Sequence, residues 1–296
     1  MRLFLPVVLI SALCVFAVGC DAPRDESDDR PAVFVSVPPQ AFLVERIAGD
    51  AVDLHVLVGP NDEPHHYEPT QREMVQFGQA DVYFRTGVPF EKQLLPKLRS
   101  VKAELTIVDT RKGLDLLAME GGHHDHDDHD HQQDADPHVW MSPRNAIVQA
   151  RTIAEELKRL IPDRAATFEE NLRTLTGELE QLDREIAASL EGLEGRTLLV
   201  FHPAFAYFAD AYGLKQVAIE QQGKSPGPRR LAELIERAKS EKVRVIFVHP
   251  QFSDRSARTI AEAIGGAVVQ IDPLARNYIE NLRTVARRVK EGLQRD

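Results

Sequence analysis

A single long helix with one apolar stripe divides this chain into two halves. Between residues 163 and 192 the sequence is rich in charged residues, yet large apolar residues recur at steps of three and four, the period of one helical face. They are Phe168, Leu172, Leu175, Leu179, Leu182, Ile186 and Leu190. At about 1.5 Å per residue such a helix is roughly 40 Å long. A coiled-coil partner could cover the stripe, but we favour a helix that packs along both halves of the chain as a stiff connection.

Short β-branched segments alternate with helical segments on both sides of this helix. The predicted strands are 32–37, 52–58, 82–84, 105–108, 197–201, 217–219, 243–248 and 267–271. Such alternation is typical of parallel sheets covered by helices on both faces. The sequence therefore predicts an α/β fold with two lobes, each a mainly parallel sheet flanked by helices. The N-terminal lobe would span 32–162, the linking helix 163–192 and the C-terminal lobe 193–296.

Residues 1–20 are predicted to be an export signal. The apolar run from Leu3 to Val18 is too short and wrongly flanked for a stable membrane span. It ends in small residues followed by Cys20, a pattern that resembles the lipobox of bacterial lipoproteins and would make Cys20 the site of lipidation. Ordinary cleavage near Gly19 is the alternative. Residues 21–31, rich in Asp, Glu, Arg and Pro, are expected to form a flexible tether.

Cysteine content and charge narrow the class of protein further. Cys14 would leave with the signal, so the mature chain has one cysteine and no internal disulfide. An exported chain of this kind must be stabilised by its core or by a metal. The net charge of −10 argues against nucleic acid as a partner and for a surface that attracts cations. No later apolar stretch approaches the roughly 18 residues that a membrane span needs.

A histidine-rich acidic run occupies residues 121–134. Its five histidines lie within nine residues and are interleaved with aspartates: His123, His124, His126, His129 and His131. Imidazole and carboxylate are ligands that zinc prefers, but a segment of this composition cannot build a core. We predict a loop that contacts metal with low affinity. The alternative is an inert, solvated acidic loop.

Several other potential metal ligands lie at or beyond the ends of predicted strands. Four histidines adjoin a proline: His65, His138, His202 and His249. Asp272 follows the last predicted strand in a similar way. Ligands of open parallel sheets bind beyond the carboxyl ends of the strands. One such histidine is most often a hydrogen-bonded structural residue, whereas several at equivalent places indicate a metal site.

Four motifs give the chain a resemblance to a known family. They are residues 58–69 (VGPNDEPHHYEP), 136–140 (DPHVW), 201–208 (FHPAFAYF), and 250–252 (PQF) with 271–274 (IDPL). Over essentially the whole mature chain, the sequence resembles the solute-binding proteins of bacterial ABC importers for zinc and manganese. It is most similar to the zinc-specific type with a histidine-rich acidic loop. The resemblance implies two α/β lobes joined by a rigid helix, with one ion in the cleft between them.

The resemblance also implies a set of metal ligands. These would be His65, His138 and His202, with Asp272 as the fourth. Manganese members of the family carry a carboxylate where this chain has His202, and three imidazoles with one carboxylate suit tetrahedral zinc.

The resemblance also concerns three further residues that are not among the four implied ligands. His66 is implied to be a surface residue or a neighbour of the ligands, although it could substitute for His65. Glu68 is implied to orient the His65 loop through hydrogen bonds. His249 departs from the family pattern, because relatives often have Glu or Gln there; it could be a further ligand, a gate, or a neutral hydrogen-bond donor beside the ligands.

The implied function is capture of Zn²⁺ outside the cytoplasmic membrane and its delivery to the permease of an ABC importer. We expect a monomer without enzymatic activity, attached to the membrane through a lipid on Cys20. The alternatives are a binding protein for manganese or another divalent metal, an adhesin-like surface role, and a zinc hydrolase. No His-Glu-x-x-His helix supports a hydrolase. Because imidazole has a reference pKa of about 6.5, zinc affinity is expected to fall steeply below about pH 6.

Overall fold

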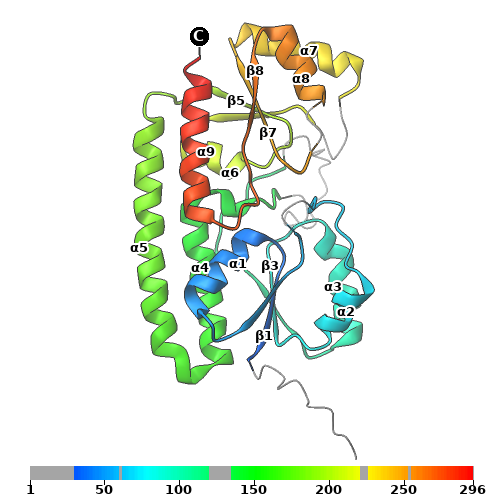
Figure 1. Ribbon diagram of the computed structural model, residues 1–296, viewed down its shortest axis with the longest axis vertical. Helices are drawn as coiled ribbons and strands as arrows, with labels where there is room; N and C mark the ends of the chain where they lie inside the picture. Colours follow the sequence, from blue (N-terminus) through cyan, green and yellow to red (C-terminus); the bar gives the residue numbers. More distant parts are fainter. Residues whose placement is uncertain (1–29, 60–61, 120–134, 221–225, 253–254, 296) are drawn as a thin grey trace, which may run out of the picture.

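Two four-stranded parallel sheets, each at the centre of its own lobe, organise the molecule (Figure 1). The computed structural model describes residues 30–59, 62–119, 135–220, 226–252 and 255–295. The predicted α/β fold with two lobes and a long joining helix is confirmed. The predicted export signal and most of the predicted tether lie outside the described residues, as does the histidine-rich run.

The sheet of the first lobe has the strand order β2-β1-β3-β4, with every pair parallel. Its strands are β1 (Ala32–Val35), β2 (Asp53–Val56), β3 (Val82–Arg85) and β4 (Thr106–Asp109). The helices of this lobe are α1 (Pro38–Ala48), α2 (Gln71–Phe77), α3 (Phe90–Val101) and α4 (Pro143–Leu160). Val33, Phe34 and Val35 of the central strand β1 are all buried. A strand covered by helices on both faces is apolar at every position, as this one is.

The second lobe repeats the arrangement with the order β6-β5-β7-β8. Its strands are β5 (Thr197–Val200), β6 (Lys215–Ala218), β7 (Val245–Val248) and β8 (Ala267–Gln270). Its helices are α6 (Ala206–Ala211), α7 (Pro228–Ser240), α8 (Arg255–Ile264) and α9 (Tyr278–Leu293). From β5 the chain turns to β6 on one side and later to β7 on the other. The order therefore reverses between β5 and β7, the place where open parallel sheets bind ligands.

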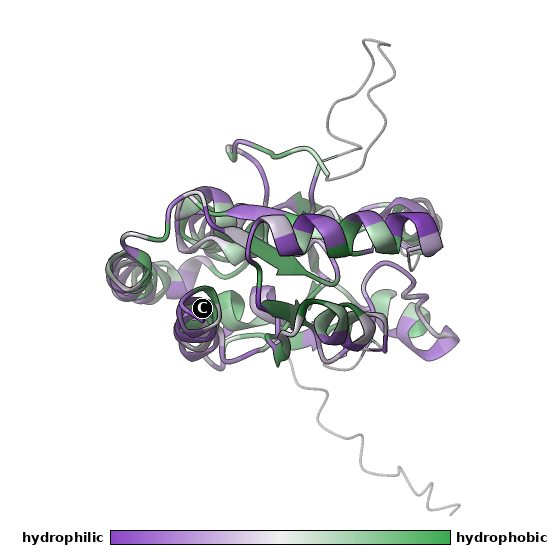
Figure 2. Ribbon diagram, turned by 90° about the horizontal axis from the view of Figure 1, so that it is seen from above, coloured by the Kyte–Doolittle hydropathy of each residue, from purple (hydrophilic) through white to green (hydrophobic). Residues whose placement is uncertain are grey.

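The long helix α5 (Ala165–Leu190) runs beside both lobes and packs against α4, α9 and α1 (Figure 1). Its predicted apolar stripe faces the core: six of the seven stripe residues are buried, and Leu172 is partly buried. One hydrophobic cluster includes residues from the first lobe, from α5 and from the second lobe. The helix therefore joins the lobes through a continuous core. Seen from above, the strands at the centre of the molecule are mainly hydrophobic, whereas the surrounding helices also carry hydrophilic residues (Figure 2).

The 3₁₀ turn η1 (Val139–Met141) of the first lobe forms hydrogen bonds with the second lobe. Trp140 is buried, and its Nε1 donates a hydrogen bond of 2.8 Å to the carbonyl oxygen of Pro273. Tyr278 of α9 donates from its hydroxyl to the carbonyl oxygen of Trp140 at 2.5 Å. Outside the core, Arg46 of α1 and Glu178 of α5 form two hydrogen bonds, of 2.7 and 2.8 Å. Among the described helices, none has the length and apolar character of a membrane span.

Candidate metal centre

Three histidines from distant parts of the sequence meet between the two sheets. His65 lies in the loop after β2, His138 lies just before η1, and His202 follows β5. One ring nitrogen from each can be chosen so that the three atoms all lie within 4.8 Å of one another. The ring centroids are 5.6 Å apart for His65 and His138, 4.7 Å for His65 and His202, and 5.3 Å for His138 and His202. The three rings therefore surround one point from three directions.

These rings line a small cavity of about 10 Å³. Its walls are formed by Pro64, His65, His138, His202, Ala204, His249, Gln251, Phe252, Pro273 and Leu274. A space of this size holds about one water molecule or one ion. Nitrogen ligands at about 2.0–2.1 Å from a common centre are what zinc requires, so the residues present fit a single zinc ion.

His138 is fixed in place by Asp136. The fully buried carboxylate of Asp136 accepts hydrogen bonds from the backbone N–H and from the ring Nδ1 of His138, both at 2.8 Å and both on Oδ1. Tyr207 of α6 donates to the carbonyl oxygen of Asp136 at 3.0 Å, so the second lobe also holds this segment. When Nδ1 donates to a carboxylate, Nε2 presents a free lone pair for a metal.

His202 has a similar partner. Its Nδ1 lies 3.0 Å from Oε1 of Glu220, and both side chains are buried. Glu220 follows β6, and its backbone N–H donates to the carbonyl oxygen of Phe201 at 2.9 Å. Two of the three histidines therefore each have a buried carboxylate that orients the ring.

Burial lowers the pKa of His65 and of His202 and so keeps these two rings neutral at physiological pH. It lowers the pKa of His65 to about 2, with added repulsion from His202 and His138. Burial also lowers the pKa of His202, although the hydrogen bond to Glu220 acts in the opposite direction. The Nε2 atom of His65 is buried and has no hydrogen-bond partner among the described residues. A neutral, unpartnered imidazole nitrogen is available as a metal ligand.

His66 and Glu68, close to His65 in the sequence, both lie at the surface. His66 points outward, with 68% of its side chain exposed, and bonds through Nδ1 to Glu63 at 2.9 Å. Glu68 is exposed, and its role in orienting the His65 loop stays a prediction. Asp62 and Glu63 form local contacts, the first by accepting from the backbone N–H of Gly59 at 3.0 Å.

The structure does not bring Asp272 into the three-histidine group. Its Oδ1 accepts hydrogen bonds from the backbone N–H of Leu274 at 2.9 Å and from Nε2 of Gln251 at 3.2 Å. The carboxylate therefore stabilises the turn after β8 in this structure, and its role as a fourth metal ligand stays a prediction. His249 lines the cavity instead.

The carboxylates Asp136 and Glu220 were not identified as site residues from the sequence. Glu220 could have been found, because it follows β6 as His202 follows the neighbouring strand β5. The signal for Asp136 was its position two residues before His138, a spacing at which a carboxylate can reach both the backbone and the ring. The predicted residues Cys20, His123, His124, His126, His129 and His131 lie outside the described residues.

The sequence is similar to that of known zinc-binding proteins. The chain matches the family described as zinc-uptake complex component A, periplasmic (ZnuA), over residues 33–292. It is 30% identical over 275 residues to the zinc-binding lipoprotein AdcA of Streptococcus pneumoniae, which covers 90% of this chain and 54% of AdcA. The chain thus spans about half the length of that relative. It is also 30% identical over 284 residues to the high-affinity zinc uptake system protein ZnuA of Bacillus subtilis, covering 90% of this chain and 87% of the relative.

A solved structure agrees with the fold. The crystal structure of a ZnuA superposes with a TM-score of 0.83 at 38% sequence identity, covering 90% of this chain and all of that one. The agreement extends over both lobes, so the relative arrangement of the two sheets is also similar.

Proposed function

This chain belongs to the ZnuA family of periplasmic zinc-uptake components, and on that premise we propose that it captures Zn²⁺ outside the cytoplasmic membrane and delivers it to the permease of an ABC importer. In this proposal His65, His138 and His202 hold the ion. The zinc ion is the cargo of the protein.

The observation that carries the proposal is the convergence of three imidazoles on a cavity that fits one ion. Their nitrogens lie within 4.8 Å of one another, and the cavity measures about 10 Å³. Two of the rings are oriented by buried carboxylates, which is the usual support for a metal-binding histidine. A structural cluster would instead use the ring nitrogens for hydrogen bonds within the protein.

The donor set favours zinc over manganese. Imidazole nitrogen suits zinc, whereas Mn²⁺ prefers carboxylate, carbonyl and water oxygens. The carboxylates of Asp136 and Glu220 are bonded to His138 and His202, so they contribute to the basicity of the ligands. We therefore expect tighter binding of zinc than of manganese.

The small size of the cavity argues against a hydrolase. A catalytic zinc site keeps one coordination position open to water and to a substrate. Here the space beside the three histidines is enclosed by Ala204, Phe252 and Leu274 and holds about 10 Å³. It has no room for an ester or a peptide beside the ion, which supports binding rather than catalysis.

The remaining parts of the proposal concern location. Residues 1–20 would direct export, Cys20 would carry a lipid anchor, and residues 21–31 would tether a monomeric binding unit to the membrane. Mass spectrometry of the membrane fraction should find a lipid on the N-terminal cysteine of the wild-type protein. In a Cys20→Ser variant the protein should instead be released in soluble form; a wild-type protein without lipid would contradict the anchor.

Calorimetric titration of the purified protein with Zn²⁺ and Mn²⁺ tests the binding function. We expect one tight zinc site, weaker manganese binding, and loss of the tight site in His202→Ala. His55→Ala is the matched control, because His55 bonds to Asp53 at 2.8 Å and stacks on Phe34 outside the centre. Tight zinc binding that survives in His202→Ala would reject the proposal.

Delivery requires a separate measurement. Uptake of radioactive zinc by cells that express the chain with its ABC permease should exceed uptake by cells that lack either protein. The His202→Ala variant should reduce uptake to the level of cells without the chain. Equal uptake with and without the chain would show that it serves another purpose, such as surface attachment.

A further inference from the structure

His249 is a buried histidine whose two ring nitrogens both lack a hydrogen-bond partner in the described part of the protein. The side chain is 2% exposed, and neither Nδ1 nor Nε2 has a hydrogen-bond partner among the described residues. Buried polar groups in native proteins are nearly always hydrogen-bonded, so each exception calls for an explanation. Here two orphaned nitrogens belong to one ring that lines the metal cavity.

The position of His249 in the fold matches that of His202. His202 lies just beyond β5 and His249 directly follows β7, the two strands between which the strand order reverses. The strands are adjacent, because Val200 pairs with Phe247 and the backbone N–H of Phe201 donates to the carbonyl oxygen of Phe247 at 2.8 Å. Side chains that follow both strands point into the crevice where ligands bind.

Among the described residues, the rings that surround His249 offer its nitrogens no hydrogen-bond partner. Phe205 and Phe252 lie 5.3 and 5.8 Å from His249 between ring centroids, and neither carries a hydrogen-bond acceptor in its side chain. The ring centroid of His202 lies 5.7 Å away. The imidazole of His249 is therefore bordered by aromatic carbon on two sides and by a proposed zinc ligand on another.

We propose that His249 is a fourth protein ligand, so that the loaded centre is held by four imidazoles. The inference rests on the proposed zinc site and adds one residue to it. It also gives one of the two orphaned nitrogens a role, because that nitrogen would bind the ion at the fourth position. Four nitrogen ligands complete a tetrahedral zinc shell without a carboxylate.

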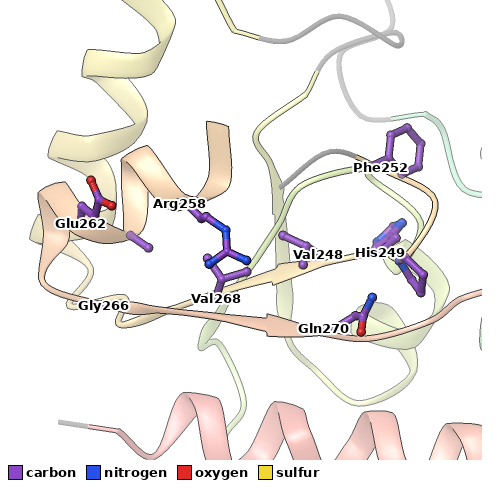
Figure 3. Close-up of a pocket in the computed structure, with 10 residues that line it drawn as sticks. Val248, His249, Phe252, Arg258, Glu262, Gly266, Val268 and Gln270 are labelled. Atoms are coloured by element: carbon purple, nitrogen blue, oxygen red, sulfur yellow. The ribbon is translucent and has the colours of Figure 1, made fainter. Parts of the chain in front are cut away.

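Ligation requires a small movement of His249, because this residue is not part of the group whose nitrogens lie within 4.8 Å of one another. A larger pocket of about 660 Å³ is also lined by His249 and Phe252, which form one end of it beyond β7 and β8 (Figure 3). His249 and Phe252 therefore line both cavities, so the ring of His249 is not held by packed core on every side.

Four imidazole ligands would increase the selectivity of the site for zinc over manganese. Each replacement of an oxygen ligand by imidazole favours zinc over manganese. The chain has a histidine at this place, so we expect stronger rejection of manganese here than in a variant with a carboxylate. His249→Glu should therefore bind manganese more tightly relative to zinc than the wild type does.

Nuclear magnetic resonance with ¹¹³Cd²⁺ as a zinc substitute counts the imidazole ligands directly. One equivalent is added to protein labelled with ¹⁵N-histidine, and the imidazole resonances split by coupling to ¹¹³Cd are counted. We expect four split rings in the wild type, four in the matched control His55→Phe, and three in His249→Phe. The count in the wild type is decisive by itself, even if His249→Phe does not fold.

Three split rings in the wild type, with the same three in His249→Phe, would overturn the proposal and leave the three-histidine zinc site intact. If Asp272→Asn then weakens cadmium binding, the fourth position belongs to that carboxylate. No split ring in the wild type would instead contradict the proposed function itself. The two failures are therefore distinguishable.

Discussion

The Nδ1 atom of His202 lies 3.0 Å from Oε1 of Glu220, a residue 18 positions later in the chain. The two side chains follow adjacent parallel strands, β5 and β6, and both are buried. The carboxylate orients the ring and increases its basicity, because it accepts a hydrogen bond from Nδ1 and leaves Nε2 available for a metal. The same relationship joins His138 to Asp136 at 2.8 Å.

Replacing Glu220 by Gln should weaken zinc binding by about 10–100-fold, because the ring loses its charged acceptor but the cavity keeps its shape. Competition with a chromogenic chelator measures the change. Glu180→Gln on the exposed side of α5 is the matched control and should bind as the wild type does. An unchanged affinity in Glu220→Gln would show that the carboxylate has only a packing role.

Acid should destabilise the metal-free protein. The folded-state pKa of His65 is lowered to about 2, whereas an unfolded histidine titrates near 6.5. Between these values the unfolded state binds more protons, so stability is complete above about pH 6.5 and falls as the pH decreases, by about 1.4 kcal/mol per pH unit for each such group. Urea unfolding at several pH values checks this slope.

A variant separates the contribution of His65 from that of the other groups. His65→Gln should reduce the slope of stability against pH between 6 and 5, while His66→Gln, which removes an exposed histidine, should keep it. Burial lowers the pKa of His65 and of His202. Protons should therefore compete with zinc for these two ligands at a lower pH than they do for free imidazole, so their part of the loss in affinity should begin further into the acid range.

Zinc should stabilise the folded protein by mass action. At a free zinc concentration about 100 times Kd, the expected gain is about 2.7 kcal/mol, seen as a higher Tm. Removal of the ion with a chelator should reverse the change. In His138→Ala the gain should disappear; a shift of equal size in this variant would mean that zinc acts elsewhere on the protein.

Truncation of the buried stripe of α5 should destabilise both lobes together. Leu179 is fully buried, so Leu179→Ala should cost about 2–5 kcal/mol of unfolding free energy. Leu172→Ala, on the same stripe but only partly buried, should cost less. Because one core includes both lobes and α5, we expect a single unfolding transition in urea for each variant; two separate transitions would contradict a shared core.

Deletion of residues 122–133 should keep the tight zinc site. The bridge between Ala118 and Ala135 brings the flanking residues together, and Asp136, which holds His138, remains in the chain. Calorimetry should show the high-affinity site unchanged, with fewer weak sites or slower capture of zinc. Loss of tight binding would mean that ligands come from the deleted residues.

The sequence by itself determined the arrangement of secondary structure and most of the candidate metal ligands. Periodicity identified α5 and its buried face, and alternation of strands and helices identified two parallel sheets. The proline-flanked histidines indicated a metal site, because three of them, His65, His202 and His249, follow predicted strands whose carboxyl ends share one edge. The choice of His65, His138 and His202 as ligands came from the resemblance to the family. These features are local patterns, which a sequence carries directly.

Only the tertiary structure decided which polar groups are adjacent to which. The pairing of Glu220 with His202 depends on the neighbouring positions of β5 and β6, and the bonds from Leu274 and Gln251 to Asp272 depend on how the turn after β8 packs. Whether the nitrogens of His249 meet a partner likewise depends on the rings around it. Hydrogen-bond geometry is set within a few tenths of an ångström by contacts between distant segments, and a residue pattern in one segment does not encode it.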